Sequence, residues 1–176
     1  MDLLEQVRDL RCEAPLPRMV TVRQHFDAPV VADIDATVAD ALAPYLAAIR
    51  PGWRIGITAG SRGIANIAQI LHAAGDAVRA HGGDPFIIPA MGSHGGATAE
   101  GQVEVLHSYG ITEETTGMPI VSSMEVREIA HLGDASDPGP VVFMSETALA
   151  ADGLIIIGRV KAHTDFRGPV ESGLAK

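Results

Sequence analysis

The feature that most constrains the fold of this chain is the alternation of short apolar strands with helical segments. Residues 53–58 and 85–90 have the composition of buried strands, and the apolar run 154–160 is typical of a strand in the middle of a sheet. Between the first two, apolar residues at helical spacing predict a helix over about 64–81 that ends at Gly82. This alternation predicts an α/β fold with a mainly parallel sheet and helices on both faces.

Weaker patterns predict the remaining elements. An edge strand is expected over Met19–Phe26, and a helix capped by Asp35 is expected to be kinked or split by Pro44. Thr98 is expected to cap a helix that runs to about Tyr109. The other expected elements are strands over 118–122, 126–131 and 141–144, and a short helix that Ser145 caps and that runs to Ala151.

Length, charge and cysteine content exclude several classes of protein. The 176 residues correspond to roughly one domain. The 13 basic and 22 acidic residues give a net charge of −9, which argues against a nucleic-acid partner. Cys12, the single cysteine, cannot form a disulfide framework or a cysteine-built zinc site. The sequence has no run of about 18 apolar residues and no signal-peptide pattern, so we expect a cytoplasmic protein without a membrane partner.

Ionisable and small side chains gather where three of the predicted strands end. In open parallel sheets, ligands bind outside the carboxyl ends of the strands, so these three exits should meet at one edge of the sheet. The first exit carries Ser61 and Arg62, the second carries Ser93 and His94, and the third carries Lys161, His163, Asp165, Arg167 and Lys176. We therefore expect the functional site at this edge.

Each exit also allows a structural interpretation. Arg62 stands just before a predicted helix N-terminus, a favourable place for an anion, but a solvated arginine in a turn is the alternative. His94 has small neighbours that would let a substrate or backbone come close to its ring, although the ring could instead bond to loop backbone. The cations of the third exit indicate a bound anion on an acidic chain, and a salt-bridged turn is the alternative.

Taken together, the three loops resemble the nickel-pincer lactate racemase family, and most closely its lactate-racemase-like branch. The segments that carry the resemblance are Gly-Ser-Arg-Gly at 60–63, Met-Gly-Ser-His-Gly-Gly-Ala-Thr-Ala-Glu-Gly-Gln at 91–102, and Gly-Arg-Val-Lys-Ala-His-Thr-Asp-Phe-Arg-Gly-Pro-Val-Glu-Ser-Gly-Leu-Ala-Lys at 158–176. The second and third motifs are specific and the first is weak alone. The likeness covers most of the chain from about Trp53 onward.

The resemblance implies that residues 1–176 form the Rossmann-like N-terminal catalytic domain of a two-domain 2-hydroxy acid racemase or epimerase. The family's cofactor is a pyridinium mononucleotide whose sulfur-containing groups hold nickel and which is tethered to a lysine. The C2 hydride of the substrate passes reversibly to the pyridinium ring while two histidines exchange the hydroxyl proton. Return of the hydride to the other face of the planar 2-keto intermediate inverts the stereocentre.

The resemblance assigns the acid/base and substrate roles to the following residues. His94 and His163 match the pair of histidines that exchange the hydroxyl proton. Arg62 matches the arginine that holds the substrate carboxylate, and Ser61 is expected to bind the substrate beside it. These roles agree with the physical demands of the reaction, because two titratable groups must flank one carbon and a fixed cation must orient the carboxylate.

The resemblance places the cofactor at the second and third exits. Lys176 matches the lysine that carries the nickel-pincer mononucleotide, and Ser93, Lys161 and Arg167 are expected to contact it. The family's nickel-ligating histidine lies further along than Lys176, as does its second domain. We therefore expect a truncated chain that lacks its C-terminal domain and is inactive alone, and whose uncovered apolar cleft favours homo-oligomers.

Two other hypotheses remain open from the sequence. The chain could be a non-catalytic domain that binds a phosphate or carboxylate through Arg62 and the glycine loops. It could also be an enzyme of this fold that performs another reaction on a hydroxy acid. Turnover that depends on His94 or His163 would separate the racemase from the binding domain.

Overall fold

The computed structural model describes residues 18–61, 63–133, 136–137, 139–160 and 167–169. Chain contacts divide the protein into two units, Met1–Val30 and Val31–Lys176. In the first unit, residues 18–30 are exposed and form neither helix nor strand. The edge strand expected over Met19–Phe26 is therefore wrong. Its apolar side chains stay in solvent, Met19 at 92% exposure, because no described strand pairs with this segment.

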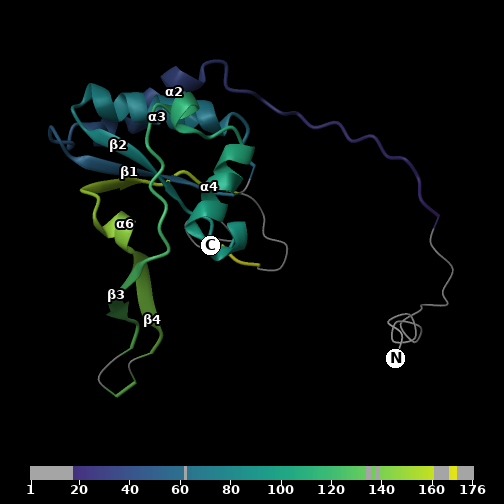
Figure 1. Ribbon diagram of the computed structural model, residues 1–176. Coiled ribbons are helices and arrows are strands. Elements are labelled where there is room, and N and C mark those ends of the chain that lie inside the picture. The colour runs from purple at the N-terminus through teal and green to yellow at the C-terminus, as the bar shows by residue number, and fades with distance from the viewer. Residues whose placement is uncertain (1–17, 62, 134–135, 138, 161–166, 170–176) are drawn as a thin grey trace, which may run out of the picture. The chain divides into compact units, whose positions relative to one another are not determined.

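The second unit holds all the helices and strands that the structure describes (Figure 1). Its helices, including the short 3-10 turn η2, are Ile34–Leu46 (α2), Ile67–Ala80 (α3), Gly95–Ala97 (η2), Ala99–Ser108 (α4), Glu113–Thr116 (α5) and Glu146–Leu149 (α6). Its strands are Arg54–Ala59 (β1), Asp84–Pro89 (β2), Val126–His131 (β3), Val141–Ser145 (β4) and Gly153–Ile155 (β5). Among the described helices, none is both long and apolar enough to reach across a bilayer.

Three of these strands form a small parallel sheet in the order β2-β1-β5. Ile57 in the central strand is the register partner of Ile87 in β2 and of Ile155 in β5. The parallel sheet predicted from the sequence is thus confirmed, with β1 in the middle. The sequence predicts the run 154–160 in the middle of the sheet instead. Only its first two residues belong to a strand, β5, which is an outer strand of the described sheet. Ile156, just after it, is exposed.

A cluster of buried hydrophobic residues packs against one face of this sheet. Ile57 and Ile87 are register partners, so their side chains point to the same face, and both are fully buried. The same cluster includes Leu71 of α3 and Leu106 of α4, and Leu42 of α2 packs against it. Phe86 and Ile88, the neighbours of Ile87 in β2, point to the other face and are also buried, so both faces of β2 are covered.

A separate antiparallel hairpin, β3–β4, completes the described elements. Every residue of β3 is exposed, and no residue of β4 is buried. Figure 1 shows the hairpin extending away from the sheet and its helices. The strand expected over 118–122 is reduced to one parallel bridge between Ile120 and Ile87. The described chain is therefore an α/β fold with a three-stranded parallel sheet and a separate hairpin.

Helix ends follow the expected capping chemistry, with two differences. The Thr98 hydroxyl accepts a hydrogen bond from the backbone N–H of Gly101 at 3.1 Å, which confirms it as the cap of α4. Asp33, rather than Asp35, caps α2. Pro44 does not split α2, because it lies in the last turn, where its missing N–H and its ring disturb little of the helix.

Candidate functional site

The parallel order of the sheet brings three strand exits to one edge, as the sequence predicts. The backbone N–H of Ala90, just after β2, donates to the carbonyl of Ala59 at 2.8 Å. On the other side of β1, the N–H of Ile157 donates to the Thr58 hydroxyl at 3.0 Å. The segments that leave β2, β1 and β5 therefore start side by side.

A side chain also links the third exit to the first. Arg159, which follows β5, donates from Nη1 to the carbonyl of Gly63 at 3.0 Å. The bond joins segments that are 96 residues apart in the sequence and holds the loop after β1 against the segment after β5. Arg159 belongs to the motif at 158–176, but its bond to Gly63 is a structural finding.

The first exit differs from the sequence prediction in its geometry. α3 begins at Ile67, so residues 63–66 separate Arg62 from the helix, and Arg62 does not stand just before the helix N-terminus. Arg62 itself lies outside the described residues. The carbonyl of Ser61, which is partly buried, accepts a hydrogen bond of 2.7 Å from the hydroxyl of Tyr109 at the end of α4. Tyr109 thereby fixes the loop that precedes Arg62.

The second exit is a glycine loop that lies directly on the first turn of α4. Gly92, Gly95 and Gly96 have φ angles of 61°, 66° and 68°, a left-handed conformation that other residues adopt only with strain. A Cβ on Gly101 would overlap the carbonyl of Gly95, so the loop backbone and the helix are in close contact. Gly95 and Gly101 are therefore required for packing, because they let the loop backbone and the helix backbone come close together.

A buried glutamine holds this loop in place. Gln102 on α4 is only 5% exposed, and its side-chain N–H donates to the carbonyl of Gly92 at 2.8 Å. Gln102 stands one helical turn after the cap Thr98, on the side of α4 that faces the loop. Gln102 is not among the residues predicted from the sequence, and its spacing from the cap is the signal that could have found it.

His94 and Ser93 sit in the middle of this loop, and both are exposed. The backbone N–H of His94 donates to the carbonyl of Met91 at 3.3 Å, which turns the chain after β2. Within the described part of the chain, the His94 imidazole has no hydrogen-bond partner, so the alternative in which the ring bonds to loop backbone is not seen. The imidazole is thus free to contact a ligand from solvent.

Most of the third exit lies outside the described residues. This holds for Lys161, His163, Asp165 and Lys176, so the structure neither brings these side chains to the edge of the sheet nor separates them from it. Arg167 is described and exposed. Of the predicted site residues, Ser61, Ser93 and His94 are thus the ones placed at the exits.

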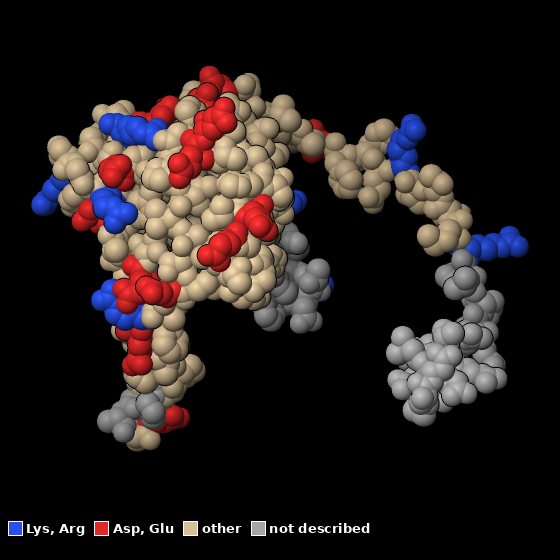
Figure 2. Space-filling model, viewed as in Figure 1, with Lys and Arg blue, Asp and Glu red and all other residues tan. Residues whose placement is uncertain are grey.

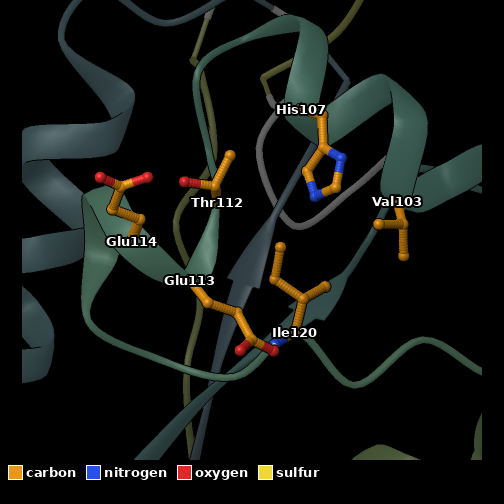
Figure 3. Close-up of a pocket in the computed structure, with 6 residues that line it drawn as sticks. All are labelled: Val103, His107, Thr112, Glu113, Glu114 and Ile120. Carbon is orange, nitrogen blue, oxygen red and sulfur yellow. The ribbon is translucent and has the colours of Figure 1, made fainter.

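An open hollow of about 430 Å³ lies elsewhere, between α4 and α5 (Figure 3). Its lining residues are Val103, His107, Thr112, Glu113, Glu114 and Ile120, and none of them is a predicted site residue. Figure 3 shows His107 above Ile120 and Glu113 beside it, and the Glu113 carboxylate accepts a hydrogen bond from the N–H of Ile120 at 3.4 Å. Among the described residues, no group of three or more His, Cys, Asp or Glu is placed to hold a metal ion.

Compared with protein-family models, curated proteins and solved structures, the chain has no match.

Proposed function

We propose that this chain is the Rossmann-like N-terminal catalytic domain of a 2-hydroxy acid racemase or epimerase that uses a nickel-pincer nucleotide. The observation that carries the proposal is the exposed His94 imidazole on a rigid glycine loop, at the sheet edge where three strand exits meet. The sequence motifs at these exits supply the remaining support.

The residues of this chain have separate tasks in the proposed reaction. His94 moves a proton to and from the substrate hydroxyl on one face, and His163 does so on the other. Arg62 binds the carboxylate of the hydroxy acid, and Ser61 lies beside it. Fixed positions matter because the hydride leaves and returns at C2 while the proton leaves and returns at the hydroxyl oxygen on that carbon, which favours loops held by Tyr109 and Gln102.

Two loops at this end of the sheet expose glycine backbone that the cofactor would contact. Cβ atoms built on Gly63, Gly92 and Gly96 would have no other heavy atom within 4 Å, so both loops present bare backbone to open space. Ser93 would contact the nucleotide there. When bound, the group supplies an acceptor for the C2 hydrogen with its electron pair. Roles for Lys161, Arg167 and Lys176 in holding it rest on the motif.

The first experiment is intact mass spectrometry and nickel analysis of the full-length gene product, co-expressed with the cofactor-synthesis enzymes. We expect an adduct of mononucleotide mass on Lys176 and about one nickel ion per chain. Lys176→Arg should abolish the adduct and keep the fold. No adduct, with the synthesis enzymes shown to work on a known acceptor protein, would overturn the proposal.

The loaded protein should then interconvert the enantiomers of a chiral 2-hydroxy acid. In deuterated water, hydride transfer returns the original C2 hydrogen, whereas proton abstraction would introduce deuterium that NMR detects. His94→Asn should lower turnover by about 10²–10⁴-fold. His107→Asn, an exposed histidine on α4, is the matched control and should leave turnover unchanged. Binding of carboxylate or phosphate without any turnover would instead support the anion-binding domain.

A further inference from the structure

Arg159 differs from several other arginines of the second unit in its partners. Arg50 and Arg54 lie over aromatic rings, and Arg79 and Arg127 pair with carboxylates. Arg159 bonds instead to a backbone carbonyl, and within the described part of the chain it has neither a ring nor a carboxylate as partner. The chain around it is acidic, with a net charge of −9, and Figure 2 shows acidic side chains spread over the visible face of this unit. A positive charge without a described carboxylate partner is therefore notable here.

The bond to Gly63 holds this charge at the edge of the sheet where the strands end. Gly63 follows β1 and Arg159 follows β5, and these two strands are parallel neighbours. Parallel strands bring their carboxyl ends to one edge, which is where ligands bind in open sheets. The Arg159 guanidinium is therefore tied to the same edge of the sheet that carries the loop of His94.

The guanidinium keeps donors for a ligand after it has bonded to Gly63. It is a planar fork of several N–H groups, of which the bond to the Gly63 carbonyl uses one. Arg159 and Gly63 are both exposed, and a Cβ built on Gly63 would meet no other heavy atom within 4 Å. A group from solvent can thus reach the remaining N–H groups. Because the side chain is already held, binding costs less rotamer entropy than it would for a free arginine.

We propose that Arg159 binds an anionic oxygen group of the ligand, a carboxylate or a phosphate, at this edge of the sheet. A guanidinium fork matches the geometry of both groups and can bond to two of their oxygens at once. The assignment of the ligand rests on the proposed function, whose hydroxy acid carries a carboxylate and whose mononucleotide carries a phosphate. Arg159 would then have two tasks, one bond to the loop after β1 and the others to the anion.

Two substitutions separate anion binding from a purely structural role of Arg159. Arg159→Gln keeps a side-chain N–H that can donate to the Gly63 carbonyl but removes the charge. Arg159→Lys keeps the charge and loses the fork. A structural role predicts that the glutamine variant binds anions as the wild type does. We expect it instead to weaken binding by about tenfold, and the lysine variant to weaken it less.

Arg50→Gln is the matched control. It removes the same charge from an exposed arginine that precedes β1, at the opposite end of that strand from Gly63. Its change in net charge equals that of Arg159→Gln, so any general loss of attraction for anions affects both variants alike. We expect Arg50→Gln to bind anions as the wild type does. Thermal unfolding of each variant checks that the fold is kept.

The measurement is NMR titration of the full chain with inorganic phosphate and, separately, with lactate as a 2-hydroxy acid. Weaker binding of phosphate alone in Arg159→Gln would assign the residue to the nucleotide phosphate, and weaker binding of lactate alone would assign it to the substrate carboxylate. The proposal would be overturned by unchanged binding of both ions in Arg159→Gln, by an equal loss in Arg50→Gln, or by a wild type that binds neither ion.

The outcome is distinguishable from that of the proposed function. Binding that depends on Arg159, together with a cofactor-loaded protein that shows no turnover, would keep this inference and reject the racemase. Turnover without any effect of Arg159→Gln on either titration would keep the racemase and reject this inference.

Discussion

The parallel sheet and the β3–β4 hairpin contain strands of similar composition in opposite environments. β1 and β2 are rich in isoleucine, and Ile57 and Ile87 are fully buried under α3 and α4. β3 and β4 also carry large apolar residues, yet Ile129 and Phe143 are about half exposed. The difference is that helices pack against the sheet, whereas no described element buries a residue of the hairpin. Burial here depends on what a strand packs against rather than on its own residues.

The largest contrast should come from removing one isoleucine in each region. Ile87→Ala leaves a cavity in the core and should lower the free energy of unfolding by about 2–5 kcal/mol. Ile129→Ala removes a solvent-exposed side chain and should change it by about 0.5 kcal/mol or less. Urea unfolding of both variants measures the two values. Similar losses at both positions would show that the hairpin is covered in solution.

An intermediate effect should show that the glycine loop belongs to the stable region. Gln102→Leu leaves the Gly92 carbonyl without its side-chain donor and should cost about 1–3 kcal/mol. Gln69→Leu on α3 is the control, because Gln69 is exposed and its bond to Asp35 is replaced by water. Chemical denaturation reports the cost, and amide exchange of residues 91–97 reports loop opening. An equal loss in the free energy of unfolding for both variants would show that the bond between Gln102 and the glycine loop does not stabilise the fold.

The smallest effect should come from the ion pair on the hairpin. Arg127→Gln removes its contact with Glu146, and because both side chains are substantially exposed the cost should be about 0–1 kcal/mol. The difference should shrink in high salt, which screens surface charges. Thermal unfolding at low and high salt measures it. A larger, salt-independent loss would indicate that this pair is shielded from solvent by a partner.

Local sequence patterns predicted the strands of the parallel sheet and the helices that pack against it. β1, β2, α3 and α4 have clear apolar periods, and Thr98 marks the start of α4 by ordinary capping chemistry. The order of the strands was harder to predict from the sequence, because an apolar run such as 154–160 does not show which strands lie beside it. The prediction of a strand over 19–26 was wrong for a related reason, because strand pairing depends on residues far away in the sequence. The short helix α5 escaped notice because four residues are too few to show a period.

The location of the candidate site could be predicted from the sequence, whereas most of the hydrogen bonds that hold its loops could not. The rule that ligands bind at the carboxyl ends of parallel strands located Ser61 and His94 at one edge. The bonds that fix the two loops come from Tyr109, Gln102 and Arg159, and each depends on side chains that meet only after folding. The spacing of Gln102 from the cap Thr98 is a usable signal, whereas Tyr109 and Arg159 bond to carbonyls 48 and 96 residues away, for which the sequence offers no spacing rule.

The order in which the sheet closes has a consequence for how the chain folds. α3 alone connects β1 to β2, whereas the bond between Arg54 and Asp152 beside β5 joins residues 98 apart. During synthesis from the N-terminus, β1 and β2 can pair long before β5 leaves the ribosome. We expect β5 to dock last, in the slow step of folding, since closing such a long loop costs entropy before any contact forms. Until then the free edge of β1 is a point of vulnerability to mispairing with other nascent chains.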